Sequence, residues 1–91
     1  MKRLEIIQLR LAGIVPANLL NDIRRSVLTG TETDTVGLYF HATIPTDLSV
    51  HIQTETKTRD THTSDFGLRL AAVLREYGMV QHTVWIEDQR K

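Results

Sequence analysis

Cysteine is absent from the chain, and its absence removes several kinds of chemistry at once. A disulfide-stapled scaffold, a thiolate zinc site and an iron–sulfur cluster all need cysteine sulfur. A cysteine nucleophile is excluded for the same reason. Any reactive group in this protein must therefore come from the remaining side chains, and histidine, with four residues, is the first to consider.

An excess of charge of either sign is also missing, because 11 Lys and Arg residues balance 11 Asp and Glu residues. Nucleic-acid binders that rely on attraction to phosphates normally carry a basic excess, so this class is disfavoured. No window approaches the ~20 apolar residues of a membrane helix. The apolar stretch near the N-terminus is interrupted by Glu5, Gln8 and Arg10, which is unlike a secretory signal. We expect a cytoplasmic protein with no nucleic-acid or membrane partner.

The composition is typical of a folded globule. Of the 91 residues, 41% are hydrophobic and 24% are charged, which argues against a disordered chain. This length provides one hydrophobic core, so we expect a single domain over residues 1–91.

Four segments alternate between apolar and polar side chains with a period of two, which is typical of strands. They span residues 3–12, 36–44, 48–53 and 80–87.

Two other segments carry apolar residues at helical spacing. The first stripe is Leu19, Leu20, Ile23 and Val27, and the second is Phe66, Leu70, Val73, Leu74 and Tyr77. Pro16 and Gly30 suit the start and stop of the first helix. Thr63 or Ser64 suits the N-cap of the second helix, and Gly78 suits its stop.

The turn at residues 45–47 joins two strands into a hairpin whose register follows from parity. A two-residue turn would place the two apolar rows on opposite faces of the sheet. A three-residue loop pairs Ile44 with Leu48 and keeps both rows on one face, so it is preferred. This register puts His41 directly across from His51, with Cβ atoms ~5 Å apart.

The predicted order β-α-β-β-α-β, with right-handed crossovers, places both helices on one face of a four-stranded antiparallel sheet. The first and third strands are then central. This is the α+β ferredoxin-like two-layer sandwich, a fold that hosts many unrelated functions. The turn at residues 13–16 resembles, in Gly13 and Pro16, the entry to the first helix of small-molecule-sensing ACT domains. That resemblance is confined to one glycine and one proline.

The sheet face away from the helices is expected to carry Leu4, Ile6, Tyr39 and Trp85, which are too apolar to stay solvated together. Such a cluster indicates a partner or a pocket, and twofold dimers are the commonest assembly. We therefore expect a homodimer through this face, with a possible small-molecule ligand. The candidate ligand or interface residues are Ile6, Arg10, Tyr39, His41, His51 and Trp85.

Specific chemistry is weakly supported by the sequence. A metal shared by His41 and His51 needs further ligands that the pattern does not supply, so no metal or cofactor is expected. His82 falls on the apolar side of its strand and is expected to be buried with one nitrogen satisfied. Ser49 and His51 stand parallel on one strand, ~6.5 Å apart at Cα, so contact between them is not expected. A hydrolase triad of Asp47, Ser49 and His51 is therefore rejected.

Three functions stay open. The first is a small dimeric interaction or small-molecule-sensing module without catalysis. The second is a small enzyme of the dimeric α+β barrel type, in which two such sheets enclose an apolar metabolite and a histidine acts as base. The third, nucleic-acid binding, is disfavoured because the two central strands present no aromatic side chains to stack bases.

Overall fold

The structure is a computed structural model that describes residues 1–13, 17–28, 35–57, 59 and 61–88. The predicted helix start at Pro16 and helix stop at Gly30 lie outside these residues, as does most of the turn at residues 13–16.

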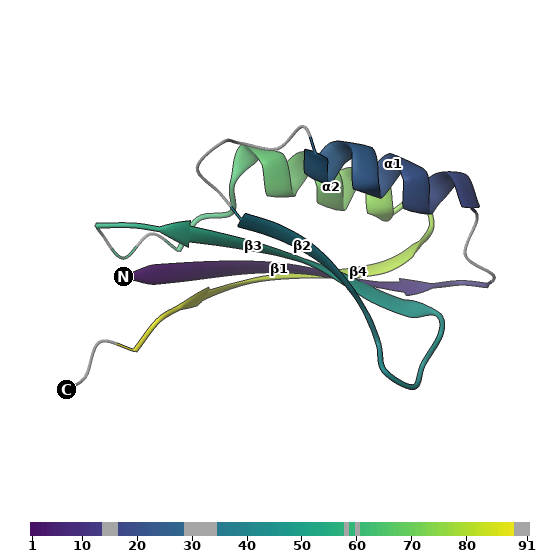
Figure 1. The fold of residues 1–91 in the computed structure, drawn as a ribbon, viewed down its shortest axis with the longest axis horizontal. Coiled ribbons are helices and arrows are strands. Elements are labelled where there is room, and N and C mark those ends of the chain that lie inside the picture. The colour runs from purple at the N-terminus through teal and green to yellow at the C-terminus, as the bar shows by residue number, and fades with distance from the viewer. Residues whose placement is uncertain (14–16, 29–34, 58, 60, 89–91) are drawn as a thin grey trace.

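Four strands and two helices alternate in the described residues in the order βαββαβ. They are β1 (Lys2–Leu11), α1 (Ala17–Leu28), β2 (Thr35–Phe40), β3 (Asp47–Glu55), α2 (Asp65–Leu74) and β4 (Gly78–Ile86). The strands form one sheet in the order β2-β3-β1-β4, and all neighbouring strands are antiparallel. Both helices cover the same face of this sheet (Figure 1). The predicted α+β ferredoxin-like sandwich is confirmed, with β1 and β3 at its centre.

The core lies between the sheet and the helices. Ile7 and Leu9 from β1 pack with Val50 and Ile52 from β3, and Leu19 and other helix residues close the layer. Each such side chain contributes about 1.5–3 kcal/mol when it is fully buried. The predicted stripe of α2 is wrong at Val73, which is 47% exposed. Leu70 and Leu74 lie one turn apart on the buried face of α2, so Val73 lies at the side of that face.

The hairpin between β2 and β3 differs from the predicted one. β2 ends at Phe40, which pairs with Leu48, so seven residues lie between the last paired residues instead of three. His41 causes the early end of the strand, because its Nδ1 accepts hydrogen bonds from the backbone N–H groups of Thr43 (3.1 Å) and Ile44 (3.0 Å). Such local bonds compete with strand pairing. The register moves by four residues, an even number, so the two apolar rows still share one face as predicted.

The two ends of α2 were predicted with different success. Ser64 is the N-cap, and its Oγ accepts a hydrogen bond from the Gly67 N–H at 2.9 Å. Gly78 is not the helix stop, because α2 ends at Leu74 and Gly78 begins β4. Its lack of a side chain serves sheet pairing instead, since a Cβ there would lie 2.1 Å from the backbone oxygen of Arg10.

Candidate functional site

The helices leave one side of the sheet uncovered, and we call this side the open face (Figure 1). Strand pairing arranges its side chains in rows that cross the sheet. One row consists of Tyr39, Ser49, Gln8 and Gln81, and the next consists of Gly37, His51, Ile6 and Thr83. The open face divides into an apolar half around Ile6 and a polar end around Gln8.

On the β2 side of the apolar half, Tyr39 lies against His51. The two ring centroids are 4.3 Å apart and the ring planes are inclined by 30°. Tyr39 reaches this position by lying over Gly37, where a Cβ would come within 2.8 Å of the Tyr39 ring. Ile6 is the cross-strand partner of His51 on its other side. The sequence therefore brings three of its candidate residues together in one cluster.

On the β4 side of the apolar half, Trp85 is 60% exposed and pairs with Leu4. Its indole N–H donates a hydrogen bond to Thr83 Oγ1 at 3.0 Å. This bond directs the indole along the strand toward the row of Ile6. Tyr39, 53% exposed, leans toward the same row from the opposite edge. The two aromatic side chains are on opposite edge strands, with Leu4 and Ile6 between them.

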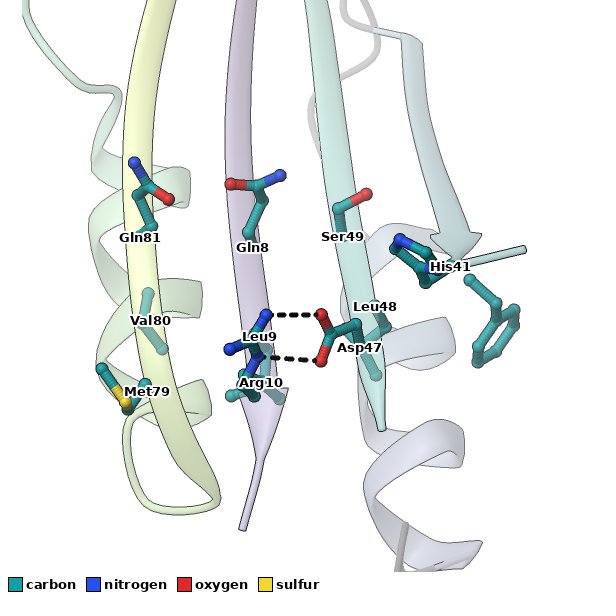
Figure 2. Close-up of a pocket in the computed structure, with 11 residues that line it drawn as sticks. Gln8, Leu9, Arg10, His41, Asp47, Leu48, Ser49, Met79, Val80 and Gln81 are labelled. Carbon is teal, nitrogen blue, oxygen red and sulfur yellow. Dashed lines mark hydrogen bonds and ion pairs between the residues drawn. The ribbon is translucent and has the colours of Figure 1, made fainter. Parts of the chain in front are cut away.

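The polar end of the open face contains a pocket of about 370 Å³. Its lining includes Gln8, Arg10, His41, Asp47, Ser49, Phe40, Met79 and Gln81. Gln81, Gln8 and Ser49 form a line across β4, β1 and β3, and the Arg10 and Asp47 side chains meet below it (Figure 2). The loop after β2 bends to the open side of the sheet (Figure 1), and its His41 is part of the pocket lining. The volume is within the range of small-molecule sites.

Arg10 and Asp47 are cross-strand partners that form a two-bond ion pair across the pocket. Arg10 Nε and Nη2 donate to the two carboxylate oxygens at 3.3 and 3.2 Å. The Arg10 side chain is largely exposed, which limits this pair's contribution to stability to well under ~1 kcal/mol. The pair does orient the guanidinium, and it leaves the pocket without net charge from these two groups.

The six predicted site residues therefore fall into two groups. Ile6, Tyr39, His51 and Trp85 belong to the apolar half, whereas Arg10 and His41 line the pocket at the polar end. His41 and His51 are not across from each other, and the predicted ~5 Å separation is wrong. His51 pairs with Gly37, and His41 lies beside Asp47, four residues away along β3. The separation along the strand is therefore about 13 Å.

This separation removes the two-histidine arrangement that a shared metal would need. Among the described residues, no group of three or more His, Asp or Glu side chains is placed to hold a metal ion.

One contact that the sequence led us to reject is present. Ser49 Oγ and His51 Nε2 are 3.1 Å apart, within hydrogen-bond distance. Side chains two residues apart on a regular strand stand parallel to each other. Here the histidine ring inclines along β3, between Tyr39 and Ile6, and reaches the hydroxyl. Asp47, the third residue of the rejected triad, bonds to Arg10 instead. The contact is therefore a pair of Ser49 and His51.

A second polar cluster lies beneath α2 and was not predicted from the sequence. Glu5 is fully buried, and its carboxylate accepts hydrogen bonds from the Ser64 N–H at 3.3 Å and from Arg3 Nη1 at 3.4 Å. His82 Nε2 lies 2.5 Å from the same carboxylate. The His82 side chain is only 7% exposed and has one nitrogen satisfied, as predicted. The alternation along the strands could have indicated this cluster, because it places Glu5 and His82 on the helix side of two neighbouring strands.

This cluster is structural. No buried side-chain nitrogen or oxygen of the described residues lacks a hydrogen-bond partner. With its acceptors occupied and no surface exposure, Glu5 offers nothing to a ligand.

No helix in the described part of the chain is both long and apolar enough to cross a membrane. Comparison of the chain with protein-family models, with curated proteins and with solved structures found no match.

Proposed function

We propose that this chain is a small interaction module that forms a homodimer through its open face and binds a small molecule in the pocket at the polar end. The observation that carries the proposal is the apolar half, where the exposed Tyr39 and Trp85 rings flank Leu4 and Ile6. Aromatic residues of this kind are enriched at the centres of protein interfaces.

A second copy suits this face in size. Four strands about 4.8 Å apart, each up to ten residues long, give a surface of about 19 by 30 Å. Because the side chains make the surface uneven, its accessible area exceeds this flat area. It therefore approaches the ~800 Å² that each partner buries in a standard interface.

A second copy also suits this face in charge. Among the described residues, the four rows of the open face from Arg10 to Leu4 contain two charged side chains, Arg10 and Asp47, which already neutralise each other. Two identical faces therefore meet without like-charge repulsion, which would otherwise oppose self-association.

The symmetry of such a dimer brings the aromatic side chains together. A twofold axis that runs along the strands, in the plane between two facing sheets, exchanges the edges of the sheet. β2 of one copy then lies over β4 of the other, so Tyr39 approaches the partner's Trp85. The polar end of one copy lies over the polar end of the other, which narrows the mouths of the two pockets.

Sedimentation equilibrium tests the dimer. The wild-type chain is expected to show reversible dimerisation, and Trp85→Ser is expected to weaken it at least ~10-fold, as the loss of an interface aromatic residue does. The matched control is Leu68→Ser with Val73→Ser, which removes similarly exposed apolar side chains from the outer side of α2. Single chains at about 1 mM wild-type protein, or loss of the dimer only in the α2 variant, would contradict the proposal.

A second candidate function is an enzyme of the dimeric α+β barrel type, in which two facing sheets enclose the reaction site. The contact between Ser49 and His51, beside a pocket of suitable size, is the specific observation in its favour.

A further inference from the structure

The pairing of Ser49 with His51 has the geometry of a nucleophile beside its base. A serine hydroxyl becomes reactive when a general base lies within about 2.6–3.2 Å, and the Oγ–Nε2 distance is 3.1 Å. For Nε2 to accept the hydroxyl proton, the neutral imidazole must carry its own proton on Nδ1. In this tautomer Ser49 Oγ–H donates to His51.

The two residues lie differently with respect to the pocket. Ser49 is half-buried and lines the pocket, whereas His51 is not part of its lining. A molecule in the pocket therefore meets the hydroxyl, and the imidazole supports it from the next row of the open face. Figure 2 shows the Ser49 hydroxyl at one end of the row that it forms with Gln8 and Gln81.

Among the described residues, packing rather than a bonded carboxylate holds the His51 ring in place. Tyr39 packs against one side of the ring, with centroids 4.3 Å apart, and Ile6 is its neighbour across the strands. In serine hydrolases an acidic residue orients the base. Here ring packing restricts the imidazole instead, which makes Tyr39 a positioning residue.

The row that contains Ser49 also supplies donors for a developing negative charge. Gln8 is its direct cross-strand partner, and Gln81 is the partner of Gln8. Carboxamide N–H groups of this kind stabilise the oxyanion of a tetrahedral intermediate. Phe40 and Met79, both more than half exposed, provide apolar lining for a small organic group.

We infer that Ser49 is a nucleophile that reacts with small activated carboxylic esters, with His51 as its base. The inference goes beyond the dimeric module, and it depends on the pocket rather than on the dimer. Ser49 Oγ attacks the carbonyl carbon while its proton passes to His51 Nε2. The ester C–O bond then breaks, and the departing alkoxide takes that proton and leaves as the alcohol.

The acyl group now on Ser49 is removed by water. A water molecule attacks the acyl carbon and gives a proton to His51. The bond to Ser49 Oγ breaks, the proton returns to that oxygen, and a carboxylic acid is released. The sum of the two halves is ester plus water giving acid plus alcohol, so no oxidant or other co-reactant is needed.

The test uses p-nitrophenyl acetate as probe with the full chain. We expect release of nitrophenolate together with an acetyl group on Ser49, located by mass spectrometry of the digested protein. His51→Gln is expected to lower the acetylation rate of Ser49 about 100-fold, which is the usual contribution of a general base. Glutamine preserves a polar side chain, and circular dichroism is the check that the variant is folded.

His62→Gln is the control for unspecific reaction of the ester with exposed imidazole, because His62 lies on the exposed loop before α2, outside the pocket lining. It is expected to acetylate Ser49 at the wild-type rate. Absence of acetyl-Ser49 in the wild type, or an equal rate in His51→Gln, would overturn the inference. Because sedimentation measures the dimer separately, failure of the ester reaction is distinguishable from failure of the proposed dimer.

Discussion

At the scale of single residues, Glu5 imposes the strictest local requirement. A carboxylate without solvent exposure is costly to bury unless donors surround it. Ser64, Arg3 and His82 supply those donors from a loop, the same strand and the neighbouring strand. The carboxylate therefore sits against the first turn of α2, where the helix dipole also favours negative charge.

Gly67 is required by this approach. A Cβ at position 67 would lie 1.9 Å from Glu5 Oε2 and 2.7 Å from its Cδ. Since Glu5 is buried and bonded on several sides, it has little freedom to move away. We expect Gly67→Ala to lower the free energy of unfolding by about 2 kcal/mol or more, despite the better helix propensity of alanine.

Urea unfolding followed by circular dichroism measures this change as a shift in midpoint. Gly13→Ala is the matched control, because a Cβ at Gly13 meets nothing within 4 Å. Its expected effect is within about 0.5 kcal/mol, as for open surface positions. Equal stabilities of the two variants would mean that Glu5 does not contact Gly67 as described.

At the scale of secondary-structure elements, the start of α2 depends on Ser64 in two ways. Its hydroxyl oxygen accepts from the Gly67 N–H, and its own N–H donates to Glu5. The second bond is the long-range counterpart of a capping box, in which a glutamate close in sequence bonds the N-cap N–H. β1 and α2 are thereby joined by their polar groups as well as by the core.

Ser64→Ala removes the first bond and keeps the second. We expect it to cost about 1 kcal/mol, the typical value for loss of an N-cap side chain. For a domain of this size that cost lowers the melting temperature by roughly 4–8 °C. Ser64→Thr retains the hydroxyl and should lie much closer to wild type in the same thermal scan. An alanine variant as stable as wild type would argue against the cap.

The hairpin shows at this same scale why element boundaries were partly mispredicted. Alternation of apolar residues continues through Ala42 and Ile44, which favours a strand to residue 44. The His41 side chain instead bonds the backbone of the two residues that follow Ala42, and closes a loop. A period-two pattern contains no information about such side-chain bonds. The predicted end of the strand and the predicted position of His41 were therefore both wrong.

At the scale of the whole molecule, self-association should be visible as a stability that depends on concentration. A partner that binds only the folded chain adds RT ln(1 + [L]/Kd), or about 2.7 kcal/mol at a hundredfold excess over Kd. We expect the melting temperature of the wild type to rise with protein concentration, and that of Trp85→Ser to rise much less.

Ionic strength provides the control for that measurement. Among the described residues, the two charged side chains in the rows from Arg10 to Leu4 pair with each other. Added salt should therefore change little how the melting temperature depends on protein concentration. A melting temperature that stays constant from micromolar to millimolar protein would contradict the dimer. Loss of the effect in high salt would indicate an interface other than the apolar half.

The sequence by itself determined the order of the elements, the sheet in which β1 and β3 are central, and the side of each strand that faces the helices. These properties follow from periodicity and turn residues, which are local. Only the tertiary structure decided the hairpin register, the donors around Glu5 and the contact of Ser49 with His51. Each depends on how loops close and how side chains pack between strands that are distant in sequence, and alternation alone does not specify those distances.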